Sequence, residues 1–242
     1  MEDYNYNSHY VTQEKAGNVS TSAFASLMHN VYNWMTLGLA MTGITAHLVA
    51  KSNLIFTIAN NSALMWGLII AELVLVIVLS ARITKMSFLT AGLLFAGYAI
   101  LNGVTMSFIF LVYTMESIAT AFFVAAGTFA AMSLVGYFIK KDLSTMGRIF
   151  FMLLIGLIIA TVVNFFVHST GLETILTYAG VLIFVGLTAY DTQKIKNMMI
   201  ELGEQGVGNE TNKLALIGSL TLYLDFINLF LYLLRIFGNR RD

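Results

Sequence analysis

Three carboxylates interrupt long apolar stretches, and they are the residues of this chain best suited to chemistry. Glu72 lies near the centre of one stretch, Asp191 toward the end of another, and Asp225 in the middle of a third. A charge inside a bilayer costs about 2.5–3.5 kcal/mol, so such a carboxylate needs a partner, water or a proton. We therefore predict that these residues belong to an ion path or a proton relay. The alternatives are a structural role as protonated carboxyls for Glu72 and Asp225, and an interfacial position beside Lys194 for Asp191.

The composition of the chain predicts a polytopic membrane protein. Of its 242 residues, 58% are hydrophobic and only 11% are charged, against about 25% charged residues in an ordinary soluble domain. The apolar runs are too long for strands and do not alternate, so helices are expected. We predict an all-α membrane protein with seven transmembrane helices, at residues 31–50, 62–81, 87–111, 117–139, 149–167, 173–195 and 214–237.

The charge distribution predicts the domain organisation and the orientation. Residues 1–25 are polar and lack the basic head and short apolar core of a signal peptide, so we expect a cytoplasmic tail. The transmembrane domain should span residues 26–238, followed by a short basic tail at 239–242. Nine of the 13 Lys and Arg residues fall on the side of the N-terminus and four on the other side. Because cytoplasmic loops collect Lys and Arg, the N-terminus should be cytoplasmic and the C-terminus external. The short chain, with short connections between its apolar runs, favours a bacterial inner membrane.

Several classes of function are disfavoured by residues that the chain lacks. Lys plus Arg and Asp plus Glu both number 13, so there is no basic excess for binding nucleic acid. The absence of cysteine excludes disulfides, zinc thiolate sites and cysteine nucleophiles. The four histidines are scattered, which gives no basis for a serine hydrolase. We expect a protein that is not an enzyme, has no resident cofactor, and has the lipid bilayer as its surroundings.

The last apolar run carries its polar residues on a single face. They follow one another at steps of three or four residues, the spacing of one face of a helix. The members of this polar stripe are Gly218, Thr221, Asp225, Asn228, Tyr232 and Arg235. Large apolar residues cover the rest of the run, so this helix should lie at the centre of a bundle with its stripe facing a wet interior.

Whether Asp191 and Asp225 meet is left open by their spacing. Upright ideal helices would place the two carboxylates at depths that differ by roughly 10 Å. A tilt or a bend of either helix could remove this difference.

Five segments together resemble the Bax inhibitor-1 (transmembrane Bax inhibitor motif) family. The two most specific are AYDTQKI at 189–195 and LYLDFINLF at 222–230. The resemblance extends to YNWMTLGL at 32–39, LSARI at 79–83 and LNGVT at 101–105. It covers roughly residues 25 to 238 and suggests a bacterial member of the family.

The resemblance implies a fold, a function and residue roles. The implied fold has two three-helix layers around the C-terminal helix, and the implied function is a calcium leak governed by pH. The family's matching aspartates make Asp191 and Asp225 a hydrogen-bonded pair that closes the pore on the cytosolic side. The resemblance also implies that Arg82 engages this pair and that Glu72 lies along the ion path.

Elementary chemistry is consistent with such a switch. Two carboxylates in a low-dielectric site cannot both ionise without a large free-energy cost, so they titrate as one unit. Calcium prefers several hard oxygen ligands. Glu72, Asp191 and Asp225, with Asn102 and water, would offer a loose transit site for calcium as the transported ion.

Two other functions are weighed against the channel. The first is a regulatory membrane protein acting through membrane protein partners, since bacterial relatives are associated with a membrane-bound ATP-dependent protease and eukaryotic relatives with cell-death regulation. The second is an intramembrane aspartyl protease. That class carries Gly-x-Gly-Asp and Pro-Ala-Leu motifs, whereas this chain has LYLD at 222–225 and no proline.

Overall fold

The computed structural model describes residues 3–202 and 209–239, with side chains placed for residues 25–200 and 211–239. Within these ranges the chain folds into helices joined by short connections and contains no strand, as the sequence predicted. The helices are α1 (Asp3–Ala50), α2 (Leu54–Ala59), α3 (Ser62–Arg82), the 3-10 helix η1 (Ile83–Lys85), α4 (Phe88–Met106), α5 (Ile109–Val112), α6 (Met115–Phe138), α7 (Ser144–Val167), α8 (Thr170–Leu202) and α9 (Asn209–Phe237).

Six segments of the described chain are long and apolar enough to cross a membrane, and they make this an integral membrane protein. They are Ser62–Lys85, Phe88–Val112, Met115–Phe138, Ser144–Val167, Thr170–Ile200 and Thr211–Phe237. Helix α1 is not among them, because polar residues such as Asn33 and His47 interrupt its apolar half. That half nevertheless packs against α4 and α9, and Leu27 and Val31 on it are fully buried.

Local hydrogen bonds explain where several helices begin. Asn61 accepts hydrogen bonds from the backbone N–H groups of Ala63 and Leu64 at the start of α3. Ser87 does the same for α4, and Thr114 for α6. Such side-chain caps satisfy N–H groups that have no partner within the helix.

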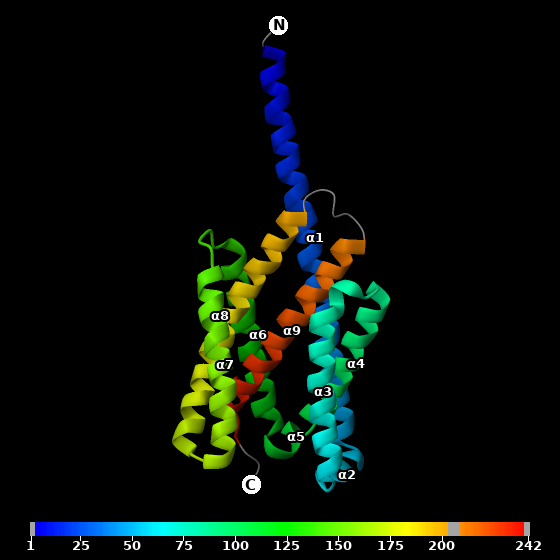
Figure 1. Ribbon diagram of the computed structural model, residues 1–242, viewed down its shortest axis with the longest axis vertical. Coiled ribbons are helices and arrows are strands. Elements are labelled where there is room, and N and C mark those ends of the chain that lie inside the picture. Colours follow the sequence, from blue (N-terminus) through cyan, green and yellow to red (C-terminus); the bar gives the residue numbers. More distant parts are fainter. Residues whose placement is uncertain (1–2, 203–208, 240–242) are drawn as a thin grey trace.

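Helix α9 lies inside the bundle and packs against α1, α4, α6 and α8. Its span is 72% buried, whereas the spans of α3 and α7 are each 6% buried. The latter two pack mainly on α4 and α8, so most of their surface is left to lipid. Figure 1 shows that α8 and α9 run obliquely across the bundle, while α3 and α7 follow its long axis.

Two expectations about helix ends, at 196–213 and at 149, are corrected by the structure. Residues 196–213 were expected to form a long polar loop, but α8 continues to Leu202 and α9 begins at Asn209. An apolar run reports the part of a helix that lies in lipid, and a helix can continue beyond it; Met199 is buried on this extension of α8. Helix α7 begins at Ser144, five residues before the run expected at 149–167. The run expected at 87–111 is confirmed as the membrane span Phe88–Val112, which contains α4 and α5. The polar segment expected to be a tail forms the first part of α1, which projects from the bundle from Asp3 onward (Figure 1).

Candidate functional site

The polar stripe of α9 lines one wall of a cavity of about 1280 Å³, which we call the aspartate cavity. The other walls come from α3, α7 and α8. The stripe residues that face it are Thr221, Asp225, Asn228 and Tyr232. The prediction that the stripe residues share one face is therefore confirmed for these four residues, and that this face is wet stays a prediction. Gly218 instead packs against Val31 and Ile195, and Arg235 lines a neighbouring cavity.

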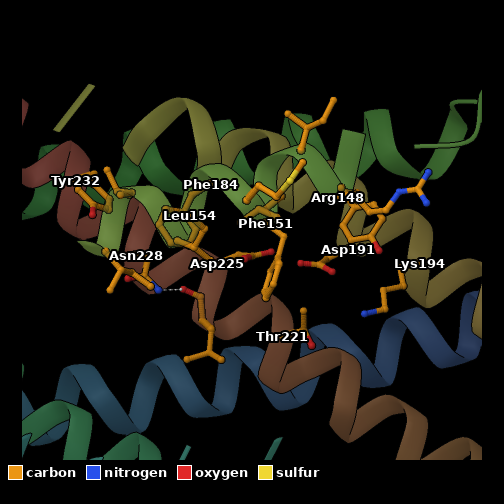
Figure 2. Close-up of a pocket in the computed structure, with 18 of the residues that line it drawn as sticks. Arg148, Phe151, Leu154, Phe184, Asp191, Lys194, Thr221, Asp225, Asn228 and Tyr232 are labelled. Carbon is orange, nitrogen blue, oxygen red and sulfur yellow. Dashed lines mark hydrogen bonds between the residues drawn. The ribbon is translucent and has the colours of Figure 1, made fainter. Parts of the chain in front are cut away.

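Asp191 on α8 and Asp225 on α9 both line this cavity and come together. Their exposed fractions are only 8% and 5%. Figure 2 shows the two carboxyl groups pointing toward one another, and each acts on the charge of the other. Because α8 and α9 pack together and run obliquely (Figure 1), the depth difference expected for upright helices does not keep the carboxyls apart.

The polar contacts of Asp225 leave room for a proton. Its Oδ2 atom is buried and has no hydrogen-bond partner among the described residues. A buried acceptor without a donor costs about 1–3 kcal/mol, and a buried charge costs more. A proton held between the two carboxyls would supply the missing donor and leave the pair with a single negative charge.

The cation that acts electrostatically on this pair is Lys194, which lies one helical turn after Asp191 on α8. Lys194 lines the aspartate cavity, and its charge acts on Asp191. Arg148 of α7 also lines the cavity, where its Nη2 donates to Thr145 Oγ1 at 3.3 Å. Arg82, which was expected to engage the pair, lies exposed in the last turn of α3 and is not among the described residues lining the cavity. Its role as a partner of the aspartates stays a prediction.

Glu72 and Asn102 come together in a second polar cluster, between α3 and α4. Thr105 Oγ1 donates to Glu72 Oε1 at 3.4 Å, and the Asn102 side chain also hydrogen-bonds Glu72. The Asn102 Nδ2 atom lies 3.4 Å from the hydroxyl of Tyr98. Asn102 is 7% exposed, and its Oδ1 atom has no partner among the described residues. The cluster therefore offers carboxylate, amide and hydroxyl oxygens at one place.

The two clusters contact α9 on different faces: the aspartate pair includes Asp225 itself, and the Glu72 cluster contacts Tyr223. Tyr223 precedes Asp225 by two residues, which turns it to the opposite side of the helix. Its hydroxyl lies 2.7 Å from Thr42 Oγ1, which also donates to the carbonyl oxygen of Ala99 at 2.9 Å. The Tyr223 ring packs edge-on against Tyr98 of the Glu72 cluster, with centroids 5.9 Å apart.

Glu72 does not join the aspartates in one ligand set. Among the side chains placed for residues 25–200 and 211–239, no three Asp, Glu, His or Cys residues gather as a metal site would require. The two clusters are still neighbours, because Val76, one turn after Glu72, lines the aspartate cavity. Calcium passing both Glu72 and the two aspartates would therefore meet two separate binding sites, one after the other.

Gln193 is a structural anchor that the sequence reasoning missed. Its Oε1 accepts from the backbone N–H of Leu143 at 2.7 Å, and its Nε2 donates to the carbonyl oxygen of Lys141 at 2.9 Å. Gln193 thus fastens the connection between α6 and α7 to α8, two residues after Asp191. The signal was available, because Gln193 is a polar residue within the family-like segment 189–195.

Comparison with known proteins decides the family. Residues 25–242 match the family model described as inhibitor of apoptosis-promoting Bax1. The chain belongs to the Bax inhibitor-1 family. This match covers both aspartates, the Glu72 cluster and the whole bundle from the apolar half of α1 onward.

Bacterial members of the Bax inhibitor-1 family are similar to this chain over nearly its full length. Inner membrane protein YbhL of Escherichia coli is 51% identical over 235 residues, which cover 96% of both chains. An uncharacterised protein of Deinococcus radiodurans is 44% identical over 90% of this chain and 91% of its own length. An uncharacterised membrane protein of Streptococcus pyogenes is 37% identical over 86% and 90%, respectively. None of these names, nor that of the family, describes an enzymatic activity.

Proposed function

We propose that this chain is a pH-sensitive calcium leak channel of the bacterial inner membrane, with Asp191 and Asp225 as its proton sensor and gate. The observation that carries the proposal is the pair of buried, facing carboxyls in a large cavity on the polar face of the central helix. Membership of the Bax inhibitor-1 family and the name of the Escherichia coli relative support the family and membrane parts of the proposal.

The gate works through the number of protons on the pair. With one proton shared, the two carboxyls attract one another and hold α8 against α9. A second proton removes the charge that strengthens this bond, and loss of the shared proton leaves two like charges that repel. Either change favours separation of the helices, and Lys194 biases the balance by stabilising the charged form of Asp191.

The calcium path uses hard oxygen donors at two places, the Glu72 cluster and the gate itself. Glu72 and Asn102 supply carboxylate and amide oxygens from α3 and α4. Asp191 and Asp225 supply the second binding site once their mutual bond opens. Calcium binds oxygen ligands in flexible geometry, and few protein ligands at each site keep the ion weakly bound and able to leave.

The proposal includes seven transmembrane helices, with residues 25–50 of α1 as the first. The packing supports two sets of three around α9, since α1 and α3 pack on α4, while α6 and α7 pack on α8. The excess of Lys and Arg on the side of the N-terminus supports a cytoplasmic N-terminus and an external C-terminus. Reporters fused to the two ends should therefore read opposite sides. The same side for both ends would overturn the seven-helix topology.

The proposed function is tested by calcium flux into liposomes containing the purified protein. The wild-type rate should change with pH, because a proton-sharing carboxylate pair titrates as one unit. Asp191→Asn and Asp225→Asn keep the shape of each side chain but remove a titratable group, so each should flatten the pH profile. The double variant should do little more, because the two residues form one unit.

A matched control separates the gate from a general loss of acidic residues. Glu116 is exposed at the start of α6 and is not among the residues lining the aspartate cavity. Glu116→Gln should keep the wild-type pH profile. Flux at background for the wild type at every pH would refute the channel and favour a protein that acts through partners. Wild-type pH profiles in both single variants would refute the paired sensor.

A further inference from the structure

A second cavity, of about 540 Å³, lies at the C-terminal end of α9, and we call it the outer vestibule. It is enclosed by the end of α7, the start of α8 and the end of α9. Hydroxyl and amide side chains make up much of its wall, and among the described residues its charged lining consists of Glu173 and Arg235. Neither of these two charged residues lines the aspartate cavity.

The outer vestibule adjoins the aspartate cavity. Thr161 of α7 lines both cavities. Along α9, Tyr232 lines the aspartate cavity and Arg235, one turn later, lines the vestibule. A polar route therefore continues from Asp225 to the end of the bundle opposite the N-terminus (Figure 1).

Arg235 is an exposed residue of α9 that lines the outer vestibule and contacts Tyr232, a residue of the aspartate cavity. Its guanidinium carbon lies 5.3 Å from the centre of the Tyr232 ring, in the geometry of a cation–π contact. The ring itself stacks on Phe184, with centroids 5.9 Å apart and planes at 26°. It also lies so close to Gly180 that a Cβ atom there would overlap it. Tyr232 thus has little freedom to move toward α8, and the exposed guanidinium of Arg235 lies over its ring, on the vestibule side.

We infer that Arg235 is the electrostatic barrier that limits entry of divalent cations at the outer mouth of the path, and that Glu173 is the opposing charge that attracts them. This inference rests on the proposed function and adds a determinant of rate and ion preference that is separate from the aspartate gate. A fixed charge beside a low-dielectric wall acts strongly on ions entering a cleft, and a divalent ion feels twice the repulsion of a monovalent one.

The experiment compares charge-removing and charge-keeping variants in calcium-loaded liposome assays. Arg235→Gln should raise the initial calcium rate about three-fold at low salt, and Glu173→Gln should lower it by a similar factor. Arg235→Lys should stay near wild type because it keeps the charge. Raising the salt to about 1 M shortens the Debye length to about 3 Å, so the differences should then largely disappear.

Two controls make the readout specific. Lys51 is an exposed cation after the end of α1, at the same end of the bundle, and does not line the vestibule. Lys51→Gln should leave the calcium rate unchanged. Arg235→Gln should also keep the shape of the wild-type pH profile, because the aspartate pair is intact.

The possible results separate this inference from the proposed function. A pH-dependent wild-type rate that Arg235→Gln leaves unchanged in correctly folded protein would overturn the barrier alone. An equal, salt-independent change in Arg235→Gln and Arg235→Lys would show that Arg235 acts by packing on Tyr232, and would also overturn it. No calcium flux in the wild type would overturn the proposed function and the barrier with it.

Discussion

Replacement of Gly136 by alanine should weaken the contact between α6 and α8 beside the aspartate gate. Gly136 is buried in α6 and faces the backbone of Ala189, which lies two residues before Asp191 on α8. A Cβ atom at position 136 would meet the carbonyl oxygen of Ala189 and would lie 2.9 Å from its carbonyl carbon and 3.0 Å from its Cα. Ordinary van der Waals contacts between carbon atoms lie at about 3.5–4.0 Å. The two helices must therefore separate by about 0.5–1 Å, because a backbone cannot rotate out of the way.

The size of the effect follows from two opposing contributions. Adding a methyl group to a filled helix contact costs about 1–3 kcal/mol. Alanine gains up to about 1 kcal/mol over glycine from helix propensity. Because the clash at Gly136 is with a backbone, the upper part of the packing cost, about 2–3 kcal/mol, applies. After the propensity gain, the free energy of unfolding should fall by about 1–2 kcal/mol for Gly136→Ala. In a protein of this length, that corresponds to a loss of about 2–8 °C in apparent Tm.

The assay is thermal unfolding of the purified protein in detergent, with Gly127→Ala as the control. Gly127 lies on the same helix, and its Cβ would meet nothing within 4 Å. Only the propensity gain applies there, so Gly127→Ala should unfold at the wild-type temperature or slightly above it. An unchanged or higher apparent Tm for Gly136→Ala would refute the close contact between α6 and α8. Equal losses in both variants would do the same, because they would show a general effect of alanine in this helix.

Three further perturbations test separate parts of the structure. Glu72→Gln keeps the shape of a side chain on the proposed path but removes its charge, so calcium flux in liposomes should fall roughly 3–10-fold at unchanged protein insertion; unchanged flux would return Glu72 to a structural role. Gln193→Leu removes two short hydrogen bonds to the connection between α6 and α7, so the free energy of unfolding should fall by about 1–3 kcal/mol, measured by thermal unfolding in detergent. Asp142 accepts hydrogen bonds from the Ser144 hydroxyl at 2.7 Å and its backbone N–H at 2.9 Å, and these lower the pKa of the Asp142 carboxyl below its ordinary value of 3.8. The stabilising contribution of the Asp142 carboxylate is therefore present above about pH 4 and is lost as the pH falls through the lowered pKa. Asp142→Asn removes this titration, so the drop in apparent Tm below about pH 4 should be smaller in the variant than in the wild type. An identical drop in the variant would contradict this.

The sequence by itself determined the helices, the membrane character and the polar face of α9, because these depend on local periodicity. Residues three or four apart share a helix face whatever surrounds them, so Thr221, Asp225, Asn228 and Tyr232 could be assigned to one side of α9 before any neighbour was known. The same reasoning placed the helix ends less well. Apolar runs report where lipid begins, whereas α8 continues past its apolar run to Leu202, and Met199 on this extension is buried.

The contacts within the site were decided only by the tertiary structure. Asp191 and Asp225 are 34 positions apart (225 minus 191) and meet because α8 and α9 pack obliquely, an arrangement that depends on all the helices around them. The cation that acts on Asp191 is Lys194 of its own helix, whereas Arg82 ends α3 at an exposed position. Glu72 was grouped with the aspartates by residue type, but its rotation on α3 turns it to Asn102 and away from them. Depth along a helix can be estimated from sequence, but the tilt and rotation that bring side chains together come from packing.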